Sequence, residues 1–170
     1  QLCNEYAFLA NKFSLTPMNG ETWKSFRIRP QNFPHRRIAM LAHYILDGFR
    51  LMENILRAKE EKTLRELFTI ELSGYWSNHY SFGDKASSSQ RALGNSSIDI
   101  ILINTVAPLY YAYSTITGNY DTSDRAISLL ESLRPEKNSI VESFTRAGVK
   151  CDDALSSQAL IQAKKEYCDT

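Results

Sequence analysis

The sequence has few cysteines, and their spacing fits neither a metal site nor a disulfide framework. Cys3, Cys151 and Cys168 are odd in number and form no C-x-x-C pair. Small secreted proteins that depend on disulfides usually carry even sets of cysteines, and a structural zinc site needs four ligands. We therefore expect reduced thiols in a cytoplasmic protein, without a metal or another cofactor.

The sequence also lacks an excess of charge of one sign. It has 20 Lys and Arg residues against 19 Asp and Glu residues, a formal net charge of +1. A protein that attracts nucleic acid or an acidic membrane through its overall field carries a much larger imbalance. Any polyanion must therefore be met by a local patch of positive charge.

No signal peptide, internal repeat or membrane span is recognisable. The longest apolar run, residues 97–116, is long enough to cross a bilayer, but Asp99, Asn104 and Thr105 interrupt it. We expect no membrane partner. A chain of this length can bury about 70 per cent of its unfolded surface and needs no covalent staple. Because it begins at Gln1 instead of methionine, we expect one helical domain, residues 1–170, cut from a longer protein.

The same apolar run, residues 97–116, is predicted to be the centre of the fold. It is too long for an ordinary strand, and an apolar helix of this kind needs other helices around most of its circumference. Ser96 or Ser97 is expected to cap its start, and Gly118 can end it in the left-handed conformation. Pro108 should remove one backbone hydrogen bond and bend the helix near Asn104.

Amphipathic helices are predicted on both sides of this segment. The fold class is therefore all-α, an irregular bundle of about six or seven helices around a buried, Pro-kinked central helix. The residues expected to face the core are Leu2, Tyr6, Leu9 and Phe13 in the first helix; Ile38, Leu41, Ile45, Phe49, Met52 and Ile55 or Leu56 in the helix after Pro34; and Leu64, Leu67, Phe68 and Leu72 in a helix that starts with a Thr63/Glu66 capping box and runs to Gly74. Three later helices are expected to be capped by Thr122 or Ser123, by Asn138 and by Ser156.

The one strongly basic region lies between Glu21 and Asp47, where the chain contains no acidic residue. Its cations are Lys24, Arg27, Arg29, Arg36 and Arg37. Arginine forks suit phosphate and carboxylate groups, so the four arginines form a candidate ligand-binding set. Alternatively, one of them pairs with a carboxylate such as Asp99 or Glu71 and pins this segment to the bundle.

Residues 75–96 are predicted to form a long loop with an aromatic start and a serine-rich second half. Such loops tend to be functional, so Asn78 and His79 join Asp99 as candidate ligand-binding residues. A catalytic histidine would need a matching nucleophile, and no such motif is recognisable. A structural hydrogen bond is therefore the alternative role for His79, and we assign no catalytic residue.

Four phrases resemble one protein family: WKSFRIRPQNFPHRRIAMLA, YWSNHYSFG, SIDIILINTVAPLYYAY and SQALIQAKKEYC. In this order they are similar to the C-terminal half of an uncharacterised family of bacterial proteins, typical of Bacteroidota, that is known as a domain of unknown function. The resemblance implies no established activity. It implies a longer parent with a separate N-terminal region that carries acidic and histidine motifs, and a cysteine-containing tail after Cys168.

Three functions remain open from the sequence. In the first, the chain is a helical accessory or interaction domain whose basic segment contacts a nucleic acid, another polyanion, a phosphorylated ligand or the missing N-terminal region. Alternatively, it is part of an enzyme, for example one that processes nucleic acid, in which Asn78, His79, Tyr80 or Asp99 completes a site on the missing region. The third alternative is a purely structural bundle. Geometry separates them: an enzyme should bring His79, Asp99 and the arginines into one cleft.

Overall fold

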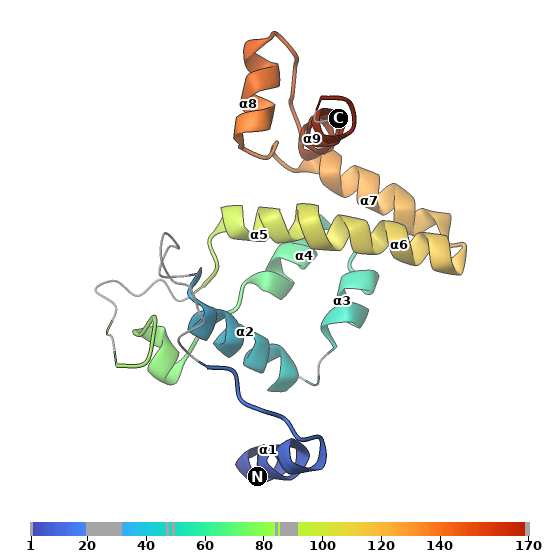
Figure 1. The fold of residues 1–170 in the computed structure, drawn as a ribbon. Coiled ribbons are helices and arrows are strands. Elements are labelled where there is room, and N and C mark those ends of the chain that lie inside the picture. Colours follow the sequence, from blue (N-terminus) through green and yellow to red (C-terminus); the bar gives the residue numbers. More distant parts are fainter. Residues whose placement is uncertain are drawn as a thin grey trace.

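The computed structural model describes residues 2–19, 32–46, 48, 50–83, 85 and 92–168. Apart from one isolated β-bridge between His79 and Lys85, every regular element in these ranges is a helix, which confirms the predicted all-α class (Figure 1). The elements are α1 (Leu2–Lys12), α2 (Pro34–Leu46), α3 (Leu51–Arg57), α4 (Glu61–Phe68), the 3₁₀ turn η3 (Gly74–Ser77), α5 (Asn95–Ile101), the π turn η4 (Leu102–Val106), α6 (Ala107–Thr117), α7 (Tyr120–Ser132), α8 (Ser139–Arg146) and α9 (Ala154–Tyr167).

The predicted central helix is a rod made of α5, η4 and α6, which follow one another without a break (Figure 1). The expected irregularity near Asn104 takes the form of a π turn, in which the N–H of Ala107 bonds to the carbonyl of Leu102. Pro108 is the second residue of α6, directly after this π turn, so the residue that cannot donate a backbone hydrogen bond lies where the helical hydrogen-bond pattern changes. Gly118 ends the rod with φ 71°, as predicted, and donates to the carbonyl of Ser114.

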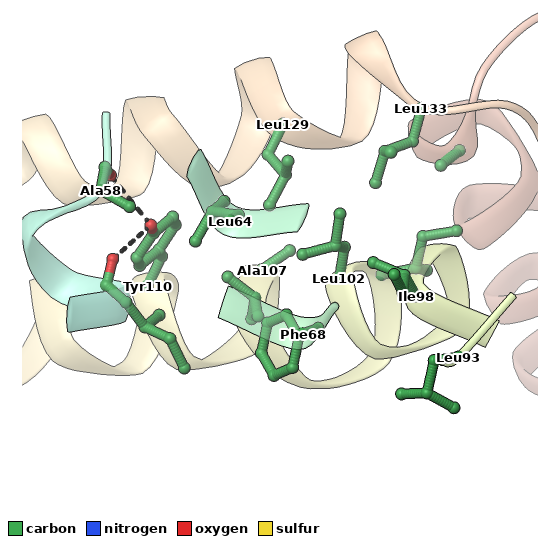
Figure 2. Packing of buried hydrophobic residues seen from close by; sticks show 14 of the residues in the cluster. Ala58, Leu64, Phe68, Leu93, Ile98, Leu102, Ala107, Tyr110, Leu129 and Leu133 are labelled. Atoms are coloured by element: carbon green, nitrogen blue, oxygen red, sulfur yellow. Dashed lines mark hydrogen bonds between the residues drawn. The ribbon is translucent and has the colours of Figure 1, made fainter. Parts of the chain in front are cut away.

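The core lies between this rod, α4 and α7. Figure 2 shows Leu64 and Phe68 of α4, Leu129 of α7 and Leu133, directly after α7, around the buried residues of the rod. Leu102, in the π turn, is 0% exposed. Full burial of a leucine side chain contributes about 1.5–3 kcal/mol, so the rod's inner face is the main source of stability here.

A hydrogen-bond network around Tyr110 and Arg125 joins the end of α3 to this core. The Tyr110 hydroxyl donates to the carbonyls of Ile55 at 2.6 Å and Ala58 at 3.2 Å, and it accepts from Arg125 Nη2 at 2.9 Å (Figure 2). Arg125 also donates to the carbonyl of Leu56 at 3.0 Å and to that of Ala58. Because the last carbonyls of a helix have no intrahelical partner and carry partial negative charge, a cation from α7 is a favourable cap for α3.

The prediction that the rod is hidden around most of its circumference is wrong. One flank faces solvent along its whole length, and Tyr111 on this flank is 64% exposed. α4 and α7 cover adjoining sides of the rod, and no described element packs against the opposite side. The exposed residues of this flank are Ile100, Asn104, Pro108, Tyr111 and Thr115.

The helix predicted after Pro34 is divided in two. Ile55 in its second half is buried in the core as predicted, whereas Ile38, Leu41 and Ile45 in its first half are exposed. Phe49 lies outside the described residues. α2 ends at Leu46 and α3 starts at Leu51, with Gly48 between them at φ 77°. α2 instead buries Met40 and Arg36, and the Tyr44 hydroxyl donates to the carbonyl of Leu67 at 2.9 Å. Burial raises the pKa of Tyr44 to about 12. We call the exposed face opposite these residues the α2 stripe; it consists of Ile38, Leu41 and Ile45.

α1 forms where the sequence predicted it, but it does not contribute to the core. Tyr6 and Phe13, two residues of its predicted core-facing stripe, are each more than half exposed. Figure 1 shows α1 beyond α2, on the side away from the rod. The spacing identified the apolar face correctly, but no described helix covers it.

The predicted helix caps were right at α8 and wrong at four other helices. Asn138 Oδ1 accepts from the backbone N–H groups of Ile140 and Val141, as expected. Asp153, not Ser156, caps α9, and its carboxylate accepts from the N–H of Ser156 at 2.7 Å. α4 starts at Glu61 and ends at Phe68, α5 starts after Gly94, and α7 starts after Asn119, all without a side-chain cap hydrogen bond. Each of these helices starts slightly before its predicted cap, because neighbouring polar residues offer competing positions.

Candidate functional site

The described part of the aromatic loop is held together by its own side chains. The His79 ring stacks on Tyr75, with 3.8 Å between centroids, and His79 Nδ1 donates to the carbonyl of Tyr75 at 2.8 Å. The Tyr75 hydroxyl accepts from the N–H of Gly83 at 2.7 Å and donates to the carbonyl of Ser81. His79 therefore has the structural hydrogen bond that was the alternative to a catalytic role. Asn78, next to it, is exposed.

The start of α2 packs on this loop. The His35 ring stacks on Trp76 and meets the edge of Phe82 at 5.5 Å. Arg36 is 0% exposed, and its guanidinium lies 5.1 Å from the centre of the Tyr80 ring. Burial lowers the pKa of Arg36, and the interaction with Tyr80 partly opposes this shift. Arg36 therefore anchors α2 to the loop through a cation–π contact and is not displayed to solvent.

The other members of the predicted arginine set are in different situations. Arg37 is half-buried and donates to Asn32 Oδ1 at 2.9 Å, and burial lowers its pKa. Arg27 and Arg29 lie outside the residues that the structure describes, as does most of the segment from Lys85 to Gln90. For these positions the sequence predictions stay predictions.

Asp99 is used in an ion-pair network away from the aromatic loop. Its carboxylate accepts from Arg65 Nη2 at 2.6 Å, and Arg65 Nε donates to Glu61 at 2.6 Å. Ser132 of α7 donates to the second oxygen of Glu61 at 2.7 Å. The partner of Asp99 is thus Arg65 of α4, not an arginine of the basic segment. This network joins α4, α5 and α7.

The carboxylate and guanidinium of this network influence each other's pKa. Burial by itself raises the pKa of Glu61, but hydrogen bonds from Ser132 and Arg65 and the charge of Arg65 lower it on balance. Burial also opposes the charge on Arg65, while Glu61 and Asp99 raise its pKa overall. Both groups are therefore held in their charged forms, as a structural ion pair requires.

The condition for an enzyme site is not met among the described residues. His79 belongs to the aromatic loop and Asp99 to the Arg65 network, and no contact joins the two. In the described ranges, no three His, Cys, Asp or Glu side chains are close enough to hold a metal ion. Cys151 is partly buried, and burial and the neighbouring Asp153 and Asp152 raise the pKa of its thiol. This shift makes it a poor nucleophile.

Sequence reasoning missed a hollow with three arginines at the junction of α3, α6 and α7. We call it the arginine hollow; its volume is about 630 Å³, and Arg50, Arg57 and Arg125 line it together with Tyr113, Asn119 and one carboxylate, Glu53. These residues come from positions 50 to 125, so no short motif contains them. Arg125 gave no local signal either, because its neighbours at helical spacing, Asp121, Thr122 and Ser128, are polar too.

The comparison with protein-family models gives one match, over residues 1–139. The chain belongs to the family described as Protein of unknown function (DUF2851). This confirms the resemblance to an uncharacterised family. The match covers the N-terminal part of this chain, so the phrase SQALIQAKKEYC, residues 157–168, lies outside it. The bacterial origin stays a prediction.

Two other comparisons add no relative to this DUF2851 protein. Neither a curated protein nor a solved structure matches the chain. Among the residues that the structure describes, no helix has the length and apolar composition needed to cross a bilayer.

Proposed function

We propose that this DUF2851 chain is a helical interaction domain, and that the α2 stripe is the docking site for an amphipathic helix of a partner. The observation that carries the proposal is the exposure of Ile38, Leu41 and Ile45 at helical spacing on a helix whose other face is buried. Three large aliphatic side chains on successive turns of one helix form an apolar face, and the apolar face of a second helix can pack against it.

Charge indicates the chemistry of that partner. Between Glu21 and Asp47 the chain has five Lys and Arg residues and no acidic residue. One of them, Arg37, directly precedes Ile38, the first residue of the α2 stripe. A partner helix with carboxylates beside its apolar face therefore gains attraction where a basic one is repelled. This is the interaction-domain function predicted from the sequence, with an acidic amphipathic helix in the place of a polyanion.

A nucleic-acid contact through the basic segment has less support. Arg36, one of its four arginines, is buried against Tyr80. Among the described residues this leaves Arg37, beside the α2 stripe, as the one arginine of the segment that reaches the surface, whereas a nucleic-acid backbone is bound by several cations. The enzyme alternative has less support for the reason given above, because His79 and Asp99 serve separate structural networks.

Two synthetic amphipathic peptides test the proposal. They carry the same leucine face, which is bordered by Glu in one peptide and by Lys in the other, and each is titrated with protein while fluorescence anisotropy is recorded. We expect the Glu peptide to bind at least about tenfold more tightly than the Lys peptide, and added salt to reduce this difference. Equal affinity for both peptides, or none for either, contradicts the proposal.

Variants localise the effect. Ile38→Ser combined with Ile45→Ser should abolish binding of the Glu peptide. Ile100→Ser and Ile127→Ser are the matched controls, because these isoleucines are also about half exposed but lie on other helices. Analytical ultracentrifugation supplies the other outcome: a dimer that the Ile38/Ile45 variant dissociates would show that a second copy occupies the α2 stripe, and the proposed partner would be wrong.

A further inference from the structure

The arginine hollow gathers positive charge from residues that lie far apart in the sequence. Three arginines and one carboxylate line a space of about 630 Å³, although the whole chain has a formal charge of only +1. Arg50 stands at the start of α3, Arg57 at its end, and Arg125 reaches the same space from α7. An anion in this space is therefore approached from two sides.

One of the three guanidinium groups is already fixed. Arg125 donates to the carbonyls of Leu56 and Ala58 and to the Tyr110 hydroxyl, and it lies 4.5 Å from the centre of the Tyr110 ring. These three bonds leave N–H donors of the five-donor guanidinium without a hydrogen bond to any described residue. A ligand that accepts from them does not have to immobilise the side chain, which lowers the entropic cost of binding.

The other two arginines are exposed and available. The Arg50 side chain is exposed and lines the hollow. Arg57 pairs with Glu53 at 2.7 Å, and both side chains are at least half exposed. Exposed pairs of this kind contribute little, so an incoming anion can replace Glu53 as the partner of Arg57.

Neutral polar groups complete the lining on the side of α6 and α7. Tyr113 of α6 carries a hydroxyl, and Asn119, before α7, makes no capping hydrogen bond with its side chain. A hydroxyl and an amide can donate to oxygens that the arginines do not reach. Together with the guanidinium forks, this donor set matches the several oxygens of a tetrahedral anion better than a single carboxylate.

We propose that the arginine hollow binds a phosphate group, and that its ligand is a small phosphomonoester. This site is separate from the α2 stripe, and it does not depend on the proposed docking function. Arg50 and Arg57 supply the exposed charge, Arg125 supplies fixed donors, and Glu53 weakens binding because its carboxylate faces the same space.

Isothermal titration of the full chain tests this with three probes: inorganic phosphate, glycerol 2-phosphate and unphosphorylated glycerol. We expect the two phosphate compounds to bind and glycerol not to bind. Arg50→Ala and Arg57→Ala should each weaken binding of glycerol 2-phosphate by roughly tenfold, in line with the loss of one charge-assisted hydrogen bond. Arg134→Ala and Arg146→Ala are the matched controls and should leave the affinity unchanged, because both residues are exposed outside the hollow.

A variant with the opposite sign makes the test sharper. Glu53→Gln removes the one carboxylate among the described residues that line the hollow and should strengthen phosphate binding by about threefold. The inference is overturned by absence of phosphate binding, by equal losses in the control variants, or by weaker binding after Glu53→Gln. It is also overturned if a single-stranded oligonucleotide binds through Arg50 and Arg57 while glycerol 2-phosphate neither binds nor competes, because the ligand would then be a nucleic acid backbone.

Discussion

The rod and α2 are both amphipathic, but the structure uses their apolar faces in opposite ways. The inner face of the rod, with Leu102 at 0% exposure, is enclosed by α4 and α7 (Figure 2). The α2 stripe has the same helical spacing, yet Ile45 is 55% exposed. Spacing therefore shows which face of a helix is apolar, whereas the connections of the chain decide whether another helix arrives to cover it.

The difference also separates stability from recognition. Residues on the inner face of the rod contribute to the free energy of unfolding, because their burial removes apolar surface from water. Residues of the α2 stripe are about half exposed and contribute little to folding, and the proposed partner would give these large aliphatic side chains a function. The first and last of four predictions test this contrast, and the other two test the polar contacts that support the core.

Leu102→Ala should destabilise the fold by about 2–5 kcal/mol, because it leaves a cavity in a closely packed core. Leu41→Ala, the same substitution on the α2 stripe, should change the free energy of unfolding by less than about 0.5 kcal/mol. Urea denaturation followed by circular dichroism measures both values. Similar losses for the two variants would show that the α2 stripe is buried, and would remove the contrast.

Arg125→Met should cost about 1–3 kcal/mol, because the last carbonyls of α3 then lose their donors inside the protein. Tyr110→Phe removes one hydroxyl from the same hydrogen-bond network and should lower the free energy of unfolding by about 1 kcal/mol. Arg134→Met, on an exposed arginine, is the control and should be neutral. If Arg125→Met unfolds no more easily than this control, the hydrogen-bond network does not stabilise the junction of α3 and the core.

Glu61→Gln should destabilise the fold by less than about 1 kcal/mol near neutral pH, with the effect disappearing in acid. The pKa of Glu61 is lowered in the folded state, so its contribution is present above the ordinary pKa of 4.5 and is lost as the pH falls through the lower folded value. Unfolding free energies of the wild type and the variant should therefore differ near pH 7 and converge as the pH falls below the lowered pKa of Glu61 in the folded state. Glu131→Gln, on the exposed side of α7, is the control, and a gap that stays constant with pH contradicts the assigned ion pair.

Much of the fold could be predicted from the sequence, because it depends on local signals. The length and composition of residues 97–116, the glycine at 118 and the asparagine at 138 were sufficient to place the rod, its end and the start of α8. The break at Gly48 was missed because apolar residues continue at helical spacing on both sides of it. The exposure of α1, of the α2 stripe and of the outer flank of the rod was missed. Whether a helix face is covered depends on where helices that are distant in the sequence lie.

The candidate sites were less predictable for a similar reason. Asp99 and His79 were chosen for their chemistry, but their roles depend on Arg65 and Tyr75, which the sequence could not place beside them. The arginine hollow was missed because its residues lie up to 75 positions apart and come together only in the folded chain. Local motifs could not reveal a site assembled in this way.

Thiol labelling of two single-cysteine substitutions tests the central contrast most directly. Ile45→Cys and Val106→Cys place a small thiol on the α2 stripe and on the inner face of the rod, where Val106 is 0% exposed. Native protein is treated with a maleimide, and labelling at each position is followed by peptide mass spectrometry, with the exposed Cys3 as an internal reference. We predict that the thiol introduced at position 45 reacts at a rate similar to Cys3, and that the thiol at position 106 reacts only after denaturation. Protection at position 45, or rapid native labelling at position 106, would contradict the account.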